Sequence, residues 1–228
     1  MYQANGKGRI WELDFFRGIA LFMMIYFHII FDMNSIFGIK VNYETGINNS
    51  IGTASGVLFI FISGIASYLS SNNLKNGIKV LLSGMLITLV SWLYSPSLII
   101  RFGILHFLGT CIILSILLKK INRYLLIALA ICIIALGFLI DDIYVSKNYL
   151  YILGLVNNTF DSSDYYPLIP WMGVFLLGIS WGKIFYKDKK SFFNKEMRDN
   201  IINTAGRHTL LVYLLHQPLI LVILTVLL

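Results

Sequence analysis

The chain has 228 residues, of which 57% are hydrophobic, and its mean hydropathy is +0.77. The apolar share of a soluble domain is nearer about 45–50%, so the composition excludes that class and predicts an integral membrane protein. The formal net charge is +7, but the basic residues flank the apolar runs, and no nucleic-acid partner is expected. We expect an all-α, polytopic helix bundle, one domain over residues 1–228, in the lipid bilayer of the cell membrane.

Apolar runs long enough to cross a hydrocarbon core of about 30 Å predict about seven transmembrane helices. They cover residues 10–33, 51–69, 78–94, 98–118, 124–140, 168–185 and 209–228. Apart from Arg17, most of the 18 lysines and arginines flank alternate ends of these runs, whereas Lys40, Arg101 and Lys147 lie at the opposite ends. The positive-inside rule then predicts a cytoplasmic N-terminus and a C-terminus outside.

The first run carries a stripe of polar residues along one helix face. With His28 at zero and about 100° per residue, Asp14 and Asp32 lie near +40° and Arg17 near −20°. Each Asp or Arg at a bilayer centre costs about 2.5–3.5 kcal/mol on translocon scales, so this stripe must face protein or water. Such a stripe indicates a functional site by default.

His28 and Asp32 are spaced i, i+4, which stacks their side chains on a helix face. A carboxylate beside an imidazole orients the ring and raises its basicity, so the pair is suited to general-base catalysis. The alternative is a histidine that a neighbouring helix satisfies, with Asp32 capping the loop. The spacing does not choose between them.

Polar residues also occur in later runs. His106 follows Arg101 by five residues, which turns the helix face by about 140°, so the two should not form one patch. His216 and Gln217 precede Pro218, where the freed carbonyls predict a kink that either shapes a cavity or eases packing. No tight ligand pair has a known metal spacing, and no metal centre is expected.

Four stretches occur together in the order and spacing of a known family: residues 9–20 with His28 and Asp32 after them, 102–106, 166–175 and 206–218. The chain thereby resembles the heparan-α-glucosaminide N-acetyltransferase catalytic domain family of transmembrane acyltransferases. The resemblance implies an enzyme that takes acetyl-CoA from the cytoplasm and acetylates an amino sugar or related glycan acceptor at the outer face.

The resemblance also implies roles for single residues. His28, oriented by Asp32, would remove the proton of the acceptor amine, or would itself carry the acetyl group. His106 would bind the acceptor or the developing oxyanion. The cofactor side is expected to comprise Arg17, Arg207 and His216, and the acceptor side Arg101 and Trp171.

Structural alternatives stay open for three of these residues. Arg17 and Asp14 are spaced i, i+3 and could form an ion pair. Arg207 could anchor the topology, and Trp171 could belong to an interfacial aromatic belt.

Two other functions fit the same sequence. One is O-acetylation of a cell-surface polysaccharide. The other is proton-coupled transport, because charged stripes with histidines also mark proton relays, although inverted repeats are not evident. A homodimer is left open.

Overall fold

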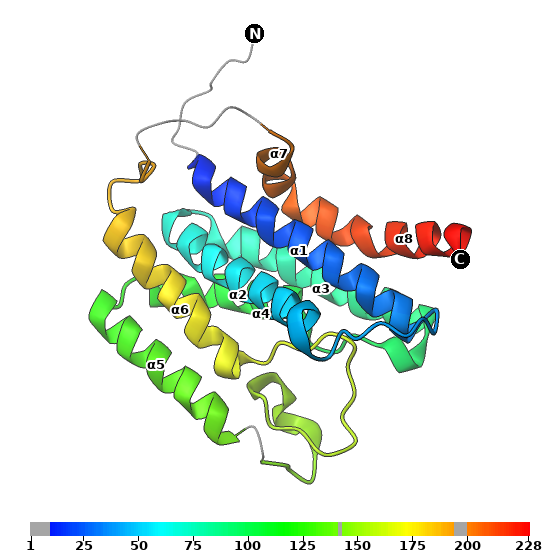
Figure 1. Ribbon diagram of the computed structural model, residues 1–228. Helices are drawn as coiled ribbons and strands as arrows, with labels where there is room; N and C mark the ends of the chain where they lie inside the picture. The colour runs from blue at the N-terminus through cyan, green and yellow to red at the C-terminus, as the bar shows by residue number, and fades with distance from the viewer. Residues whose placement is uncertain (1–9, 141–142, 194–199) are drawn as a thin grey trace. The chain divides into compact units, whose positions relative to one another are not determined.

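The computed structural model describes residues 10–140, 143–193 and 200–228. It is built from helices, and the described residues contain no strand (Figure 1). The α-helices are α1 Trp11–Ser35, α2 Gly46–Leu69, α3 Asn73–Tyr94, α4 Ile104–Leu118, α5 Arg123–Ile140, α6 Leu168–Phe185, α7 Ile201–Arg207 and α8 Thr209–Leu227. Two short 3-10 helices, η1 Pro96–Leu98 and η2 Asn148–Leu153, complete the set. The predicted all-α class is confirmed.

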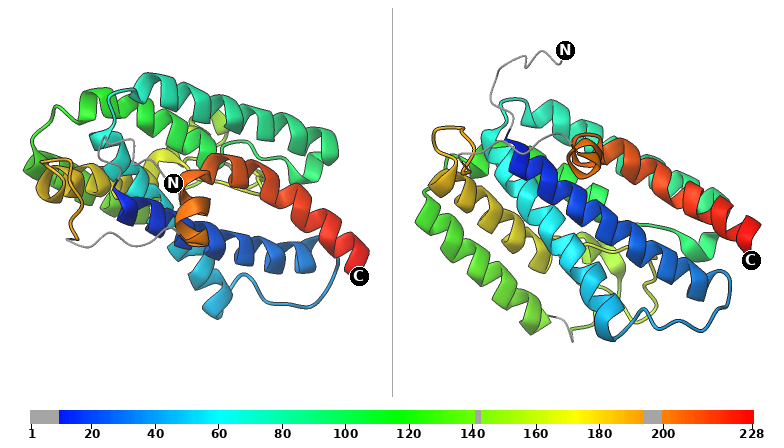
Figure 2. Two further views of the ribbon diagram at one scale, coloured as in Figure 1. Left: turned by 90° about the horizontal axis from the view of Figure 1, so that it is seen from above. Right: turned by 45° about the horizontal axis from the view of Figure 1, so that its top comes forward.

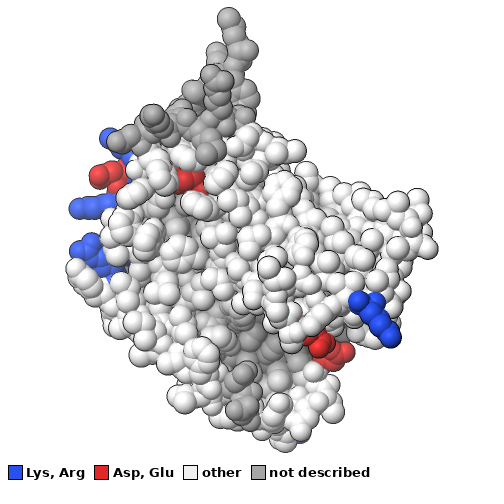
Figure 3. Space-filling view, in the orientation of Figure 1, with Lys and Arg blue, Asp and Glu red and all other residues white. Residues whose placement is uncertain are grey.

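Six of these helices are long and apolar enough to cross a membrane: α1, α2, α3, α5, α6 and α8. The expected seventh, α4, is shorter at 15 residues. It begins at Ile104 rather than near residue 98, because η1 and an extended segment come first, with Gly103 at φ −81° and ψ −177°. Figure 3 shows a broad uncharged surface, as lipid contact requires. The orientation of the termini stays a prediction.

The chain divides into two compact units by its internal contacts. The terminal unit comprises residues Met1–Phe59 and Phe185–Leu228, and the central unit comprises Ile60–Ile184. Helix α2 contributes to both. The terminal unit otherwise holds α1, α7 and α8, and the central unit holds α3 to α6.

In the terminal unit, the first half of α1 lies against α7 (Figures 1 and 2), and α8 contacts the second half of α1. Two glycines allow the backbones to meet. A Cβ on Gly18 would overlap the main-chain oxygen of Ile202, and a Cβ on Gly206 would overlap that of Asp14. The helix pair therefore depends on both positions lacking a side chain.

Helix α8 continues through Pro218, and the chain instead breaks at His208, which separates α7 from α8. Its backbone lies at φ −105° and ψ 24°. The break lets α7 pack on α1 while α8 takes a direction of its own (Figure 1). The N-terminal half of α8 carries His216 and Gln217 toward α1.

The central unit has a tightly packed interior. The side chains of Phe107, Phe175, Leu126 and Ile179 are fully buried. Helix α3 approaches α4 at Gly84, where a Cβ would lie 3.0 Å from the main-chain nitrogen of His106. These contacts hold His106 and the start of α4 in place.

Candidate active site

His28 lies on α1 with its ring held by its own helix. Its Nδ1 is 2.9 Å from the main-chain oxygen of Met24. A carbonyl oxygen only accepts, so the neutral ring must carry its hydrogen on Nδ1. The Nε2 atom therefore presents a lone pair, which is the form that a base or nucleophile needs.

His216 on α8 repeats this arrangement. Its Nδ1 is 2.5 Å from the main-chain oxygen of Tyr213, which leaves Nε2 as an acceptor. That Nε2 is buried and has no hydrogen-bond partner among the described residues. The rings of His28 and His216 meet edge to face, with centroids 4.8 Å apart and an interplanar angle of 87°.

Asp32 is fully buried and binds Gln217 rather than His28. The Gln217 Nε2 donates at 2.8 Å to each carboxylate oxygen. The expectation that Asp32 orients His28 is therefore wrong as to the partner, since Met24 supplies that hydrogen bond. The i, i+4 spacing places His28 and Asp32 on one face of α1, but the Asp32 carboxylate accepts its hydrogen bonds from the Gln217 amide on α8.

The Gln217 amide is fixed by this contact, and its Oε1 is left buried without a hydrogen-bond partner in the described part of the chain. His28 and His216 are in ring contact, Gln217 adjoins His216, and each of the three has a side-chain atom that can accept a hydrogen bond. Two of these atoms, Nε2 of His216 and Oε1 of Gln217, are buried without a donor among the described residues. We call the three residues the acceptor cluster. Buried acceptors without donors cost free energy, so this acceptor cluster favours a ligand that donates hydrogen bonds.

Asp14 joins the two arginines that were expected to meet a cofactor. Its Oδ1 lies 3.4 Å from Nη1 of Arg17, and its Oδ2 lies 3.8 Å from Nε of Arg207. The carboxylate is buried, whereas both guanidinium groups are partly exposed. We call Arg17 and Arg207 the arginine pair, and because guanidinium groups are common ligands of phosphate, these two partly exposed groups suit a phosphate group. The ion pair and the cofactor role are thus compatible.

His106 belongs to the central unit and is held by Thr88. The Thr88 hydroxyl donates to the main-chain oxygen of Ile100 at 2.6 Å, so it accepts from Nε2 of His106 at 3.2 Å. His106 Nδ1 is buried without a hydrogen-bond partner in the described residues and faces Gly84 of α3. The ring N–H of His106 was expected to bind the acetyl acceptor or a developing oxyanion. In the structure it donates to the Thr88 hydroxyl instead.

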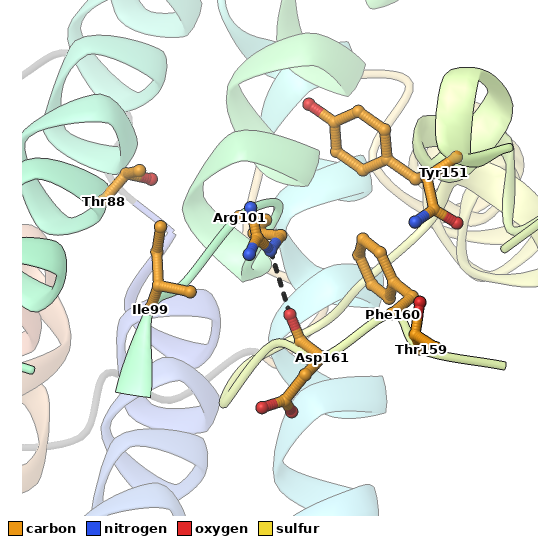
Figure 4. Close-up of a pocket in the computed structure, with 8 residues that line it drawn as sticks. Thr88, Ile99, Arg101, Tyr151, Thr159, Phe160 and Asp161 are labelled. Carbon is orange, nitrogen blue, oxygen red and sulfur yellow. Dashed lines mark hydrogen bonds between the residues drawn. The ribbon is translucent and has the colours of Figure 1, made fainter. Parts of the chain in front are cut away.

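Arg101 lines a cavity of about 420 Å³ in the central unit, beside Tyr151 and Phe160 (Figure 4). Trp171 packs its ring on Tyr166, with centroids 4.9 Å apart, at the start of α6. It is not among the described residues that line this cavity. Of the two residues expected on the acceptor side, only Arg101 lines this cavity.

Asp164 fixes the start of α4 from the loop before α6. Its Oδ2 accepts the main-chain N–H of Ile104 at 2.9 Å. Burial raises the pKa of the Asp164 carboxyl to about 6, and the bond from Ile104 opposes that shift.

The chain matches the family described as heparan-alpha-glucosaminide N-acetyltransferase, catalytic, over residues 9–218. It belongs to that family. Comparisons with curated proteins and with solved structures return no significant match. Membership in the heparan-alpha-glucosaminide N-acetyltransferase family confirms the resemblance and indicates a membrane acetyltransferase-like function.

Every residue of the acceptor cluster and the arginine pair lies inside the span matched to this acetyltransferase family. Sequence reasoning missed three partners: the Met24 carbonyl, Gln217 as the partner of Asp32, and Thr88. Gln217 could have been found, because it is a polar residue beside His216 in an apolar run. Thr88 and Met24 gave no comparable signal.

Proposed function

We propose that this protein transfers an acetyl group from acetyl-CoA to the amine of an amino sugar or related acceptor. The observation that carries the proposal is the acceptor cluster of His28, His216 and Gln217. An amine offers two or three N–H donors to such a cluster, whereas a hydroxyl offers one. This favours N-acetylation over O-acetylation of a polysaccharide.

In the proposed reaction, the neutral amine nitrogen attacks the thioester carbonyl carbon, and the carbonyl electrons move to oxygen. Nε2 of His28 takes the amine proton as the new C–N bond forms. The tetrahedral intermediate then collapses, the C–S bond breaks, and CoA leaves as a thiolate that takes the proton from the His28 imidazolium. General-base help of this kind contributes about 10²–10⁴-fold. Direct attack by the same Nε2 would give the acetyl-histidine route instead.

The arginine pair supports a place for acetyl-CoA. Arg17 and Arg207 offer partly exposed guanidinium groups around the buried Asp14, and phosphate is a preferred partner of arginine. A cytoplasmic origin of acetyl-CoA rests on the predicted topology. His216 was expected on this cofactor side, but its contact with His28 favours the acceptor amine.

The experiment uses purified protein in detergent with acetyl-CoA and glucosamine, and measures free thiol and acetylated product together. We expect His28→Gln to lower turnover by about 10²-fold or more, since the amide lacks a basic nitrogen. Tyr26→Phe, two residues earlier on α1 at an exposed position, is the matched control.

No CoA release above the His28→Gln background, across amine and hydroxyl acceptors, would overturn the proposal. Release with hydroxyl acceptors alone would favour the O-acetyltransferase. Proton-driven uptake by proteoliposomes without CoA release would favour the transporter. The roles of Arg101, Trp171 and His106 toward an acceptor stay predictions.

A further inference from the structure

The cavity in the central unit has the size of a small-molecule site. Its volume of about 420 Å³ falls within the range of about 300–1,000 Å³ that is usual for small-molecule pockets. Tyr151 and Phe160 line it together with Thr88, Ile99, Arg101, Asn148, Thr159 and Asp161. Figure 4 shows Tyr151 and Phe160 on one side of Arg101, and Thr88 and Ile99 on the other. Aromatic rings, short polar side chains and one guanidinium group thus line the same space.

Arg101 is anchored in a way that leaves its terminal amino groups available. Its Nε donates to the main-chain oxygen of Asp161 at 3.0 Å, and its main-chain nitrogen donates to Oγ of Ser162 at 3.1 Å. Its Nη1 and Nη2 atoms have no hydrogen-bond partner among the described residues. The carboxylate of Asp161 points away from the guanidinium (Figure 4). The guanidinium, fixed through Nε, can therefore donate two hydrogen bonds from Nη1 and Nη2 to a carboxylate or a phosphate.

The aromatic wall is supported from behind. The rings of Tyr151 and Phe160 lie 5.9 Å apart at 34°, and Tyr165 packs on Phe160 at 4.9 Å. The Tyr165 hydroxyl also donates to the main-chain oxygen of Tyr151 at 2.5 Å. A ring face that is held in place offers a flat, electron-rich surface to the C–H face of a sugar ring.

We infer that this cavity binds a sugar-sized ring that bears a carboxylate or a phosphate. Arg101 binds the anionic group, and Tyr151 and Phe160 pack against the ring. Identifying this ligand with the acetyl acceptor rests on the proposed function, whereas the binding itself does not.

The test measures direct binding to the purified full-length protein by ligand-observed NMR and calorimetry, without acetyl-CoA. The probes are methyl glucuronide, glucose 6-phosphate, neutral methyl glucoside and cationic glucosamine. We expect the two anions to bind at least about tenfold more tightly than the neutral sugar, since a hydrogen bond to a charged group contributes about that factor. A preference between them identifies carboxylate or phosphate as the natural group.

Variants assign the binding to this cavity. Arg101→Gln should remove the preference for anions, and Arg101→Lys should retain part of it. Phe160→Leu should weaken the neutral and anionic sugars alike, because both pack on the ring. Lys147→Gln, a cation lost from the same loop region but outside the cavity lining, is the matched control and should change nothing.

Equal binding of neutral and anionic sugars, or an anion preference that survives Arg101→Gln, would overturn the inference. Loss of all binding in Arg101→Gln would still support the inference if Arg101→Lys binds the anions as the wild type does. The positive charge at position 101 would then be the property that binding requires. CoA release measured in parallel separates the two proposals. A protein that acetylates amines but shows no anion preference here would retain the proposed function and lose this inference.

Discussion

Gln217 donates its side-chain N–H groups to both carboxylate oxygens of Asp32, at 2.8 Å each, across 185 residues of sequence. The contact ties α8 to α1 next to the two histidines, since His216 adjoins Gln217 and His28 lies one turn before Asp32. The pair therefore sets the register in which the acceptor cluster is assembled.

Replacing Gln217 by Leu should destabilise the protein, because Asp32 is then buried without its donor. We expect the free energy of unfolding to fall by about 1–3 kcal/mol, the usual cost of an unsatisfied buried polar group, and by more if the buried carboxylate is charged. Thermal unfolding in detergent measures the effect. The double variant Asp32→Leu with Gln217→Leu should recover much of it, since removing both partners is nearly neutral. A double variant no more stable than the single one would show that the contact is not what Gln217 contributes.

His216→Phe keeps a ring against His28 and removes the buried acceptor Nε2. We expect this variant to fold, to lower kcat or raise KM for the amine, and to leave KM for acetyl-CoA unchanged. Steady-state kinetics with each substrate varied in turn measures the two effects separately. If the variant raises only the KM for acetyl-CoA, His216 contacts the cofactor rather than the amine.

Arg17→Gln and Arg207→Gln should each raise KM for acetyl-CoA by about tenfold or more, since a hydrogen bond to a charged group contributes about 1.5–3 kcal/mol. The two effects should not add, because both side chains share Asp14. Kinetics with the two single variants and the double variant measure this coupling. Lys187→Gln, an exposed cation in the terminal unit, is the control. If the KM for acetyl-CoA is unchanged in both arginine variants, Asp14, Arg17 and Arg207 form a structural ion-pair network and do not bind the cofactor.

Gly18→Ala and Gly206→Ala should each force α1 and α7 apart, because the added Cβ meets main-chain oxygen atoms that cannot rotate away. Overpacking of this kind costs about 1–3 kcal/mol, so both variants should melt earlier and bind acetyl-CoA less tightly as Arg207 shifts. Ser50→Thr, which adds a methyl group at an exposed position of α2, is the matched control. Normal melting of both glycine variants would contradict the observed close approach.

Asp164 should make stability depend on pH in a definite direction. Its pKa is about 6 in the folded protein and 3.8 when unperturbed, because burial disfavours the charge. The folded state thus binds the proton more tightly, and the contribution of Asp164 to stability falls as pH rises from 4 to 6. Asp164→Asn keeps an acceptor for Ile104 and removes the titration. The melting temperature of the wild type relative to this variant should rise between pH 7 and pH 5. If the difference in melting temperature between the wild type and Asp164→Asn stays constant with pH, the Asp164 carboxyl is solvated rather than buried.

The membrane class, the helical fold and the positions of most spans follow from the sequence, because lipid requires long apolar helices whatever the neighbours are. The polar stripe of the first span and the family motifs likewise indicated His28, Asp32, Arg17 and Arg207 without coordinates. One span was misjudged at its start: η1 and the extended segment before Ile104 shorten α4, and the carboxylate that fixes its first turn comes from Asp164.

Only the tertiary structure decided which partners from distant segments the carboxylates of Asp32 and Asp14 take. Helical spacing puts Asp32 one turn from His28, yet the nearest carbonyl binds the imidazole and an amide from α8 binds the carboxylate. In the same way, Asp14 meets Arg207 because two glycines let α7 reach α1. Periodicity along one helix determines which residues share a face. The donors and acceptors opposite that face belong to segments distant in sequence, and only packing brings them there.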